Sequence, residues 1–379
     1  MPQPHLDEDL LNRPGGRLEL ATPTLVLDLD ALEANIAAMA AWATREGVGL
    51  RPHAKTHKSA AIGRLQMAAG ALGLCCAKLS EAEALAAAGL DRFLLTAPVV
   101  GARRIDRLLK LARTAEVMVV ADDADNVAAL GAAAVAAGRD LGVLIDVDIG
   151  QDRTGVLDAA GALALAEAIA AEPRLAFKGL QGYAGHVQHI ADLDERRRAS
   201  HTCLAKLATV RDRLEAAGHA CPIVTGSGTG SHALDPAAGV LTELQVGSYI
   251  VSDVEYDAVD LSIDGRRPLR SALFVYSRVV SACHAGFVTI DAGSKSLAMD
   301  GPPPEVAFGA PQGTSYTCVG DEFGRLTLPP GSTSPRPGDL VGLVAPHCDP
   351  TINCFDWYHG VRGDDLVEIW PIEARGCSA

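Results

Sequence analysis

The segment Arg-Pro-His-Ala-Lys-Thr-His-Lys-Ser gathers four nitrogen-bearing side chains within six residues: His53, Lys55, His57 and Lys58. A lysine that points into a desolvated pocket becomes nucleophilic and can hold a carbonyl cofactor as a Schiff base. An ordinary basic cluster at the surface is the alternative. Lys55 is the better candidate of the two lysines because it precedes the expected start of a helix.

A second segment, Thr-Gly-Ser-Gly-Thr-Gly-Ser at 225–231, is rich in glycine and hydroxyl side chains. Glycines let a backbone approach an anion closely, and successive N–H groups form a nest for phosphate. Such loops also occur without a ligand. The next apolar run ends in a similar way, so the expected phosphate cradle comprises Thr225, Gly228, Thr229, Gly247, Ser248 and Tyr249.

Two further polar groups follow apolar runs. Arg153 stands in a polar turn, where it is either a surface residue or a donor to a phenolate or carboxylate. Tyr183, His186 and His189 lie within the segment QGYAGHVQH. Each residue alone is more often structural, but the cluster is a candidate for acid–base chemistry.

Near the C-terminus, the segment APHCDPTINCFD offers His347 and Asp349 as a pair of metal ligands. If the segment is a strand, positions i and i+2 share a face, and both side chains can chelate one ion. An imidazole with a carboxylate suits Mn²⁺, Mg²⁺ or Zn²⁺, with water or substrate completing the coordination. A hydrogen-bonded His–Asp pair in a turn is the alternative.

Alternating strands and helices must position these residues. Eight apolar runs are expected to be strands, at 49–54, 73–77, 92–97, 116–121, 142–148, 177–184, 222–226 and 243–250. The intervening helical stretches cover 58–69, 80–88, 102–113, 124–137, 157–171 and 193–218. Eight such strands in about 200 residues predict an α/β fold with a closed (β/α)₈ barrel. An open doubly wound sheet fits less well, because no early Gly-x-Gly-x-x-Gly occurs.

From about residue 265 the helical periodicity ends. Short strand-like runs are separated there by Gly, Pro and Asp, namely LFVYSRVVSA, GFVTIDAG, GRLTLPPG, DLVGLVAPH and DLVEIWPI. This texture predicts a mainly antiparallel β-domain at 263–379 after a barrel at 31–262. The segment TLVLDLD at 24–30 is assigned as a strand outside the barrel, and residues 1–30 are expected to join the β-domain. Asp30, with Glu33 three residues later, is the expected N-cap of the following helix.

Composition restricts the partners and the compartment. The net charge of −14 argues against nucleic acid, which needs clustered Lys and Arg. The first residues lack the blocks of a signal peptide, and no apolar run has the length of a membrane span. The nine cysteines form no zinc or disulfide spacing, and Cys75 and Cys76 are expected to be buried thiols. A cytoplasmic protein without membrane contact is therefore expected.

Taken in order, these motifs resemble the fold-type III family of pyridoxal-phosphate (PLP) enzymes that contains D-threonine aldolase and the zinc-dependent D-serine dehydratase. The resemblance runs from TPTLVLDLDALEANI through RPHAKTHKS, DVDIGQDRTG, GYAGHVQH, TGSGTGS and PHCDPT to WPIEARG, and so covers nearly the whole chain. It implies an alanine-racemase-like barrel followed by a β-domain, and a homodimer.

The resemblance also implies residue roles. Lys55 would hold PLP as a Schiff base, Arg153 would meet the phenolic oxygen, and His189 would sit near the β-hydroxyl of the substrate. Gly228, Thr229, Gly247 and Ser248 would surround the phosphate. His347 and Asp349 would hold the divalent metal, for which the aspartate favours Mn²⁺ or Mg²⁺ where the dehydratase type has a cysteine suited to zinc.

The expected activity is therefore cleavage of D-threonine and related D-β-hydroxy-α-amino acids to glycine and an aldehyde. A metal-dependent dehydratase acting on D-serine or 3-hydroxyaspartate, a 3-hydroxyaspartate aldolase and a non-catalytic PLP carrier are the alternatives. Members of the family usually have histidine at the positions of Phe323 and Phe355, and these two departures bear on substrate preference.

Overall fold

The computed structural model describes residues 5–262 and 269–379 and divides them into two compact units. One unit, called the barrel unit below, contains residues 37–247, 259–262 and 376–379. The other, called the β-domain, contains residues 5–36, 248–258 and 269–375. The boundary expected between residues 262 and 263 falls at the edge of a segment outside the described residues, and the expected division of the chain stays a prediction.

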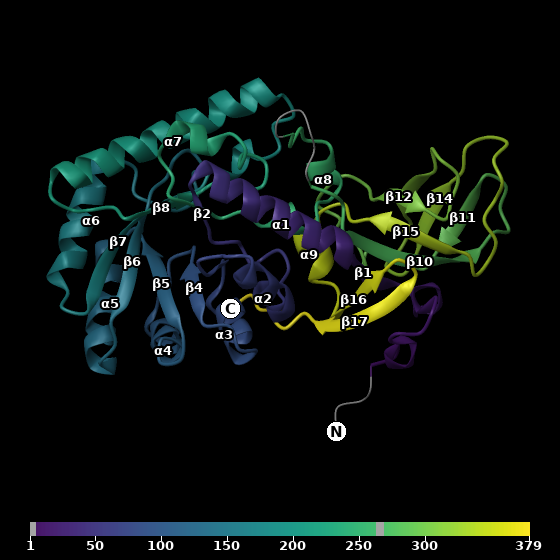
Figure 1. Cartoon of the computed structure of the whole chain (residues 1–379), viewed down its shortest axis with the longest axis horizontal. Helices are drawn as coiled ribbons and strands as arrows, with labels where there is room; N and C mark the ends of the chain where they lie inside the picture. Colours follow the sequence, from purple (N-terminus) through teal and green to yellow (C-terminus); the bar gives the residue numbers. More distant parts are fainter. Residues whose placement is uncertain (1–4, 263–268) are drawn as a thin grey trace. The chain divides into compact units, whose positions relative to one another are not determined.

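The barrel unit is built on a sheet of eight parallel strands, in the order β2-β9-β8-β7-β6-β5-β4-β3 (Figure 1). The strands are β2 (Gly49–Leu50), β3 (Leu74–Cys76), β4 (Arg92–Leu95), β5 (Glu116–Ala121), β6 (Leu141–Asp146), β7 (Leu175–Gly182), β8 (Ile223–Gly226) and β9 (Glu243–Leu244). A parallel bridge between His53 and Cys75 links the two ends of this order. The sheet is the closed barrel that the sequence predicts.

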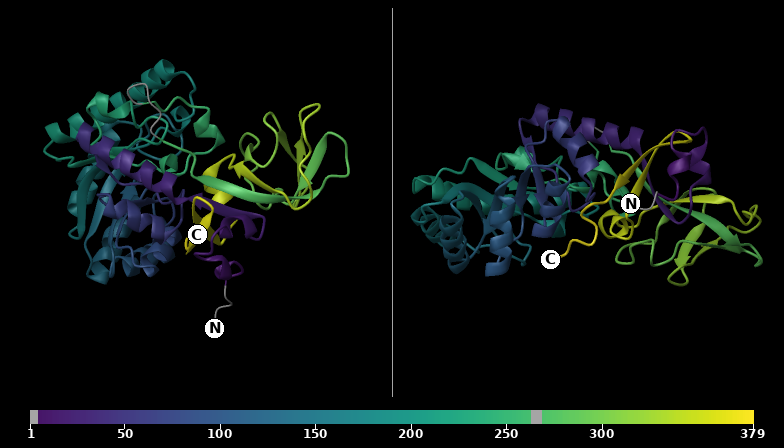
Figure 2. Two further views of the ribbon diagram at one scale, coloured as in Figure 1. Left: turned by 45° about the vertical axis from the view of Figure 1, so that its right-hand side comes forward. Right: turned by 90° about the horizontal axis from the view of Figure 1, so that it is seen from below.

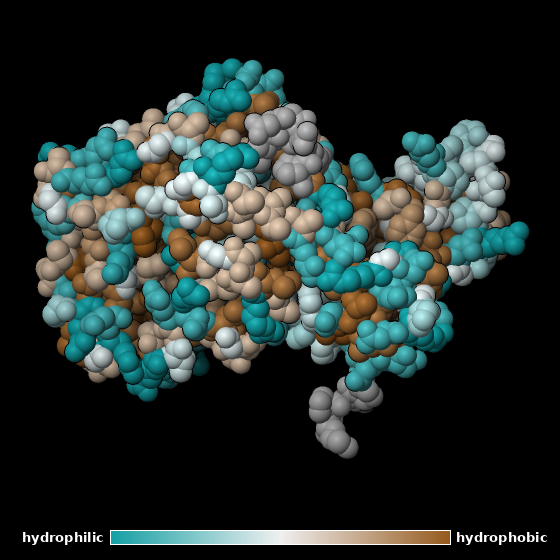
Figure 3. Space-filling view, in the orientation of Figure 1, coloured by the Kyte–Doolittle hydropathy of each residue, from teal (hydrophilic) through white to brown (hydrophobic). Residues whose placement is uncertain are grey.

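Helices alternate with these strands. They are α1 (Leu29–Glu46), which begins in the β-domain, α2 (Ala60–Ala68), α3 (Leu79–Ala87), α4 (Ala102–Leu111), α5 (Ala124–Ala137), α6 (Ala159–Ala171) and α7 (Leu193–Ala216). Brown and teal patches are mixed over the surface of this unit that faces the viewer in Figure 3, in line with the alanine-rich sequences of its helices. One buried cluster of Cys75, Leu94, Met118, Val120 and Leu144 spans four neighbouring strands. The prediction that Cys75 and Cys76 are buried is confirmed.

Three local predictions in this part of the chain need correction. Asp28, rather than Asp30, caps α1, because the strand ends at Asp28 and its carboxylate accepts the N–H of Ala31 at 2.9 Å. The strand expected at 49–54 extends only over Gly49–Leu50. The N–H groups of Arg51 and His53 still donate to Leu244 O and Val246 O, but Pro52 between them has no N–H to donate. The strand expected at 243–250 ends at Leu244, and the chain then forms a 3₁₀ turn, η5 (Ser248–Ile250).

The β-domain is mostly antiparallel and includes the first strand of the chain. Its strands are β1 (Thr24–Asp28), β10 (Leu273–Ser281), β11 (Phe287–Ile290), β12 (Glu305–Phe308), β13 (Ser315–Cys318), β14 (Gly324–Thr327), β15 (Leu340–Val344), β16 (Trp357–Arg362) and β17 (Asp365–Pro371). β1 pairs antiparallel with β10 and parallel with β16, as the purple, green and yellow strands in Figure 2 show. Two short helices, α8 (Val254–Asp257) and α9 (Cys348–Ile352), complete it.

The N-terminal segment packs on this sheet. Leu10 and Leu20, from the 3₁₀ turn η1 (Glu8–Leu10) and the residue after η2 (Gly16–Glu19), join Val26, Val361 and Leu366 in one buried cluster. Asn12 N–H also donates to Leu366 O at 2.7 Å. Burial of these apolar side chains stabilises the contact by roughly 1.5–3 kcal/mol for each fully buried side chain. Residues near the two ends of the sequence therefore form one core.

Candidate active site

Lys55 lies at the carboxyl end of the first barrel strand, where active-site residues of such barrels gather. Its backbone N–H donates to His53 Nδ1 at 3.3 Å, and its side chain is half-buried. Lys58 is different, because its ammonium forms a 2.7 Å ion pair with the buried carboxylate of Glu81. Lys58 is therefore committed to a structural pair, and Lys55 remains the candidate for covalent attachment of a cofactor.

Amide side chains and one buried carboxyl group form a network at the ends of the barrel strands. Gln181 Nε2 donates to Thr96 O at 3.0 Å and to Asp146 Oδ1 at 2.9 Å. Gln245 Nε2 donates to Gln181 Oε1 at 3.0 Å and to Thr225 Oγ1 at 3.2 Å. Burial raises the pKa of Asp146, although hydrogen bonds from Thr154 and Gln181 oppose the shift. The network links strands β4, β6, β7, β8 and β9 and holds their ends in place.

The side chain of Gln188 holds the glycine-rich segment after β8 by hydrogen bonds. Its Oε1 accepts the N–H groups of Gly230 and Ser231 at 2.9 and 3.1 Å, and its Nε2 donates to Ser231 Oγ at 3.0 Å. Ser231 Oγ also donates to the buried carboxylate of Asp235 at 2.7 Å. A Cβ at Gly230 would lie 1.9 Å from the carbonyl oxygen of Gln188, so only glycine fits there.

The same segment has the features of a phosphate cradle. Residues 224–232 are all buried, and within the described chain the backbone N–H groups of Gly228 and Gly247 have no protein acceptor. The two glycines follow β8 and β9, which are neighbours in the sheet. Buried N–H groups are normally paired, so two free donors at adjacent strand ends fit an anionic ligand. The residues present therefore fit a phosphorylated cofactor.

Three other predicted residues of the barrel unit follow β6 and β7. The guanidinium of the exposed Arg153 lies 5.7 Å from the centre of the Tyr183 ring, a cation–π contact that brings these two residues together. His189 is exposed in the turn after η3 (Gly185–Val187). His186 instead lies 3.7 Å from the thiol of Cys203. Both histidines are exposed, but His186 contacts Cys203 and Gln151, whereas His189 follows the buried Gln188 directly in the chain.

The predicted metal pair lies in the β-domain, but its local structure differs from the expected strand. β15 ends at Val344, His347 is the N-cap residue of α9, and Asp349 stands in the first turn of that helix. A proline is tolerated in the first turn of a helix, which allows Pro350 to follow. The prediction that His347 and Asp349 share one face of a strand is therefore wrong.

Neighbouring carboxylates hold the His347 segment. Asp300 Oδ2 lies 3.1 Å from His347 Nδ1, and Asp253 Oδ2 accepts the N–H of Cys348 at 2.9 Å. Burial raises the pKa of Asp253, while the N–H donors of Tyr256 and Cys348 oppose the shift. A carboxylate on one imidazole nitrogen orients the other nitrogen for a metal. The donor set of one imidazole and one carboxylate fits a divalent ion.

The remaining predicted residues of the β-domain are Ser248 and Tyr249, which are buried in η5. Phe323 is exposed before β14, and Phe355 is half-buried after α9. The structure also supplies site residues that the sequence analysis missed, namely Thr96, Asp146, Gln181, Gln188 and Gln245. Four of them lie inside the strands expected at 92–97, 142–148, 177–184 and 243–250, and a polar residue within such an apolar run is a signal that could have revealed them.

Comparisons with known proteins agree with this geometry. Residues 27–254 match the family model described as alanine racemase, N-terminal domain, and residues 272–361 match a putative serine dehydratase domain. The chain belongs to this alanine-racemase-like, fold-type III family of PLP enzymes.

Among its relatives, the chain is 42% identical to D-threonine aldolase of Arthrobacter sp, over 97% of this chain and 96% of that protein. It is 39% identical to 3-hydroxy-D-aspartate aldolase of Paracoccus denitrificans strain Pd 1222, over 94% and 93%. The crystal structure of D-threonine aldolase from Filomicrobium marinum superposes with a TM-score of 0.92 at 39% identity, covering 96% and 98% of the two chains.

A more distant relative is D-threo-3-hydroxyaspartate dehydratase of Delftia sp. strain HT23, which is 28% identical over 93% of this chain and 97% of that protein. One of its solved structures is a cysteine variant in the metal-free form, with a TM-score of 0.82. Within the described residues, no helix has the length and apolar character needed to cross a membrane.

Proposed function

We propose that this protein cleaves D-threonine and related D-β-hydroxy-α-amino acids to glycine and an aldehyde, with PLP and a divalent metal as cofactors. Identities of 42% and 39% to two aldolases, against 28% to a dehydratase, support a carbon–carbon lyase. The second of those aldolases makes 3-hydroxyaspartate an additional candidate substrate.

Lys55 would hold PLP, and the N–H groups of Gly228 and Gly247 would bind its phosphate. Thr229 and Ser248 adjoin these donors in the chain, while Arg153 and Tyr183 would contact the ring end of the cofactor. When bound, PLP supplies an electron sink for the bond that breaks at Cα. The hydrogen-bond network around Gln181 and Gln245 would keep the strand ends rigid, so that the N–H groups of Gly228 and Gly247 stay in position.

His189 would remove the proton of the substrate hydroxyl. Its ring is exposed in the turn after β7, on the residue next to the buried Gln188. A general base has to be open to substrate and held by a fixed backbone, and the hydrogen bonds of Gln188 provide that anchor. His189 therefore combines access with a defined position.

His347 and Asp349 would hold the divalent metal, with Mn²⁺ or Mg²⁺ favoured and Zn²⁺ as the alternative. The metal would supply Lewis acidity that lowers the pKa of a bound hydroxyl. Asp300 would orient the imidazole of His347 through Nδ1. The aldolase proposal rests on the carboxylate of Asp349, because the dehydratase type has the pattern His-x-Cys at the positions of His347 and Asp349.

Product analysis with D-threonine and added Mn²⁺ tests the proposal. Glycine and acetaldehyde in equal amounts are the expected products. Formation of 2-oxobutyrate and ammonia would instead identify a dehydratase, and binding of PLP without turnover would identify a carrier. The same assay with D-3-hydroxyaspartate tests the second substrate class.

Two properties of the whole protein belong to the same proposal. We infer a homodimer from the family resemblance, and light scattering of the purified protein tests it. We also infer a reducing, cytoplasmic environment, since all nine cysteines are free thiols and four of them are buried in the barrel unit.

A further inference from the structure

We infer that the β-domain has a second metal site, formed by His5, Asp7 and His359, that fastens the N-terminal segment to β16 through a zinc-type divalent ion. The site is separate from His347 and Asp349 and does not depend on the proposed reaction. Within the described chain, these three residues are the one set of three or more whose ligand atoms all lie within 4.8 Å of one another.

The tautomer of His359 provides the first argument. His359 Nδ1 lies 3.2 Å from the carbonyl oxygen of Leu25 and 2.8 Å from Thr24 Oγ1. Because a carbonyl oxygen can only accept, the contact with Leu25 favours the tautomer with its proton on Nδ1, which leaves the lone pair of the neutral ring on Nε2. This arrangement of a second-shell acceptor on one nitrogen and a free lone pair on the other is typical of metal-binding histidines.

The surroundings of Nε2 provide the second argument. Among the residues that the structure describes, His359 Nε2 is buried and has no well-aligned hydrogen bond, although Asp7 Oδ2 lies only 3.2 Å away. The His359 side chain is only 5% exposed. The other oxygen of Asp7 accepts the N–H of Ala21 at 3.1 Å, which fixes the carboxylate and leaves Oδ2 facing the imidazole. Two electron-rich atoms that face each other in a buried site call for a cation between them.

The spacing fits a metal ion. Ligands about 2.1 Å from a tetrahedral zinc ion are about 3.4 Å apart, close to the nitrogen–oxygen separation in this site. His5 completes the set, since its ring centre lies 5.0 Å from that of His359. Its Nδ1 now accepts the N–H of Asp7 at 3.1 Å, a bond that coordination at Nδ1 replaces. Two imidazoles and one carboxylate suit zinc, with water as the fourth ligand on the half-exposed side of His5.

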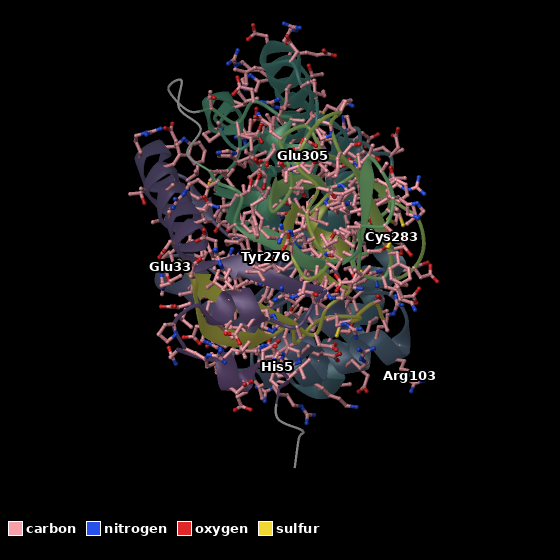
Figure 4. The ribbon with its side chains drawn as sticks, turned by 90° about the vertical axis from the view of Figure 1, so that its right-hand side faces the viewer. His5, Glu33, Arg103, Tyr276, Cys283 and Glu305 are labelled. Atoms are coloured by element: carbon pink, nitrogen blue, oxygen red, sulfur yellow. The ribbon has the colours of Figure 1, made fainter. Side chains whose placement is uncertain are left out.

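The ligands come from distant parts of the sequence, which suggests the purpose of the ion. His5 and Asp7 belong to the segment before β1, and His359 lies in β16, opposite Val26 of β1. Figure 4 labels His5 where the described chain begins. Binding would therefore add stability to the attachment of the N-terminal segment.

The test uses tag-free PLP-loaded protein with Asp349→Ala, which disables the predicted catalytic metal pair. The chelated and dialysed protein is titrated with Co²⁺ alone, whose visible absorption distinguishes tetrahedral from octahedral coordination. We expect one equivalent bound with tetrahedral bands, and quenching of Trp357, whose ring lies 5.2 Å from that of His5. Zn²⁺ should displace the Co²⁺ and slow hydrogen exchange of the backbone around residues 5–12.

Two variants in the same background locate the site. His5→Ala removes a half-exposed ligand, and Asp7→Asn keeps an acceptor for the Ala21 N–H, so both should fold. Each should weaken Co²⁺ binding on the order of 100-fold, since a lost ligand costs several kcal/mol. His284→Ala, which changes an exposed histidine stacked on Phe287, is the matched control and should bind like the parent.

The proposal is overturned if the Asp349→Ala protein binds no Co²⁺, or if His5→Ala and Asp7→Asn bind it as tightly as their parent. In either case the three residues form an ion pair with protonated His359 instead of a metal site. Neither outcome would affect the aldolase proposal, because product analysis with D-threonine is an independent measurement.

Discussion

At the carboxyl ends of the barrel strands, the amides of Gln181, Gln245 and Gln188 fix their surroundings with several hydrogen bonds each. In the β-domain, by contrast, imidazoles lie against carboxylates at His347 and His359. Neutral amide networks satisfy each other and keep their geometry without a ligand. A buried imidazole–carboxylate set, such as that at His359, needs a proton or a metal to balance it, whereas the pair at His347 is partly exposed. We therefore expect loss of a single side-chain donor to change the stability and cofactor affinity of the barrel unit. Loss of metal should instead change the properties of the β-domain.

The largest expected effect is that of Lys55→Ala, which should remove both activity and the absorbance band of the lysine-bound cofactor. Lys58→Ala is the matched control. It leaves Glu81 buried without its partner, so it should lower the melting temperature yet retain the band. A band that survives in Lys55→Ala and disappears in Lys58→Ala would show that the other lysine binds the cofactor.

The next largest effect should come from the metal pair. Chelation, or Asp349→Ala, should lower the rate of carbon–carbon cleavage on the order of 10³-fold, because a Lewis acid contributes several kcal/mol. The cofactor band should change little, since the metal is expected to bind the hydroxyl of the substrate and not PLP. Asp349→Cys should shift metal preference towards zinc. Full activity of chelated enzyme would contradict the assignment.

Gln188→Ala should have a smaller effect, on stability and cofactor affinity together. It leaves the buried N–H groups of Gly230 and Ser231 without an acceptor, at a cost of about 1–3 kcal/mol. Urea unfolding and PLP titration measure the two effects, and Gln312→Ala, at an exposed position, is the control. Unchanged PLP affinity in a destabilised variant would show that the loop does not depend on Gln188 for its binding geometry.

The smallest effect is expected from His232, which is buried behind the glycine-rich segment. Its Nδ1 donates to Thr229 O at 2.7 Å, and burial lowers its pKa from 6.5 to about 4. Below pH 6.5, His232 therefore becomes protonated in the unfolded chain but stays neutral in the folded protein until the pH approaches about 4. Stability should fall by about 1 kcal/mol between pH 6.5 and about 5.5 from this group.

Unfolding of wild type and His232→Gln at both pH values checks this prediction. The variant keeps a side-chain N–H donor but does not titrate, so its stability should depend less steeply on pH. Equal slopes for the two proteins would show that His232 can be protonated in the folded state. The ring also lies edge-on to Trp42, 5.1 Å between centres, so the variant will lose some packing at both pH values.

The β-domain was harder to predict than the barrel unit. Strands β12, β13 and β16 were missed, because they are four to six residues long and have weak alternation. In the barrel unit, α5 and β5 were predicted to the residue, since long helices and buried strands have strong local periodicity. Short edge strands depend on pairing with distant partners, such as β15 for β12.

The sequence by itself determined the alternating barrel, the lysine-bearing strand end and the glycine-rich segment, since each is a local pattern of residue types. Only the tertiary structure decided that Lys58 forms an ion pair with Glu81, and that the backbone of Gln188 lies too close to Gly230 for any other residue there. It also placed His5 and Asp7 beside His359, near the other end of the chain. Such pairings depend on strand register and on side-chain direction across distant segments, and neither is written in the local spacing of residues.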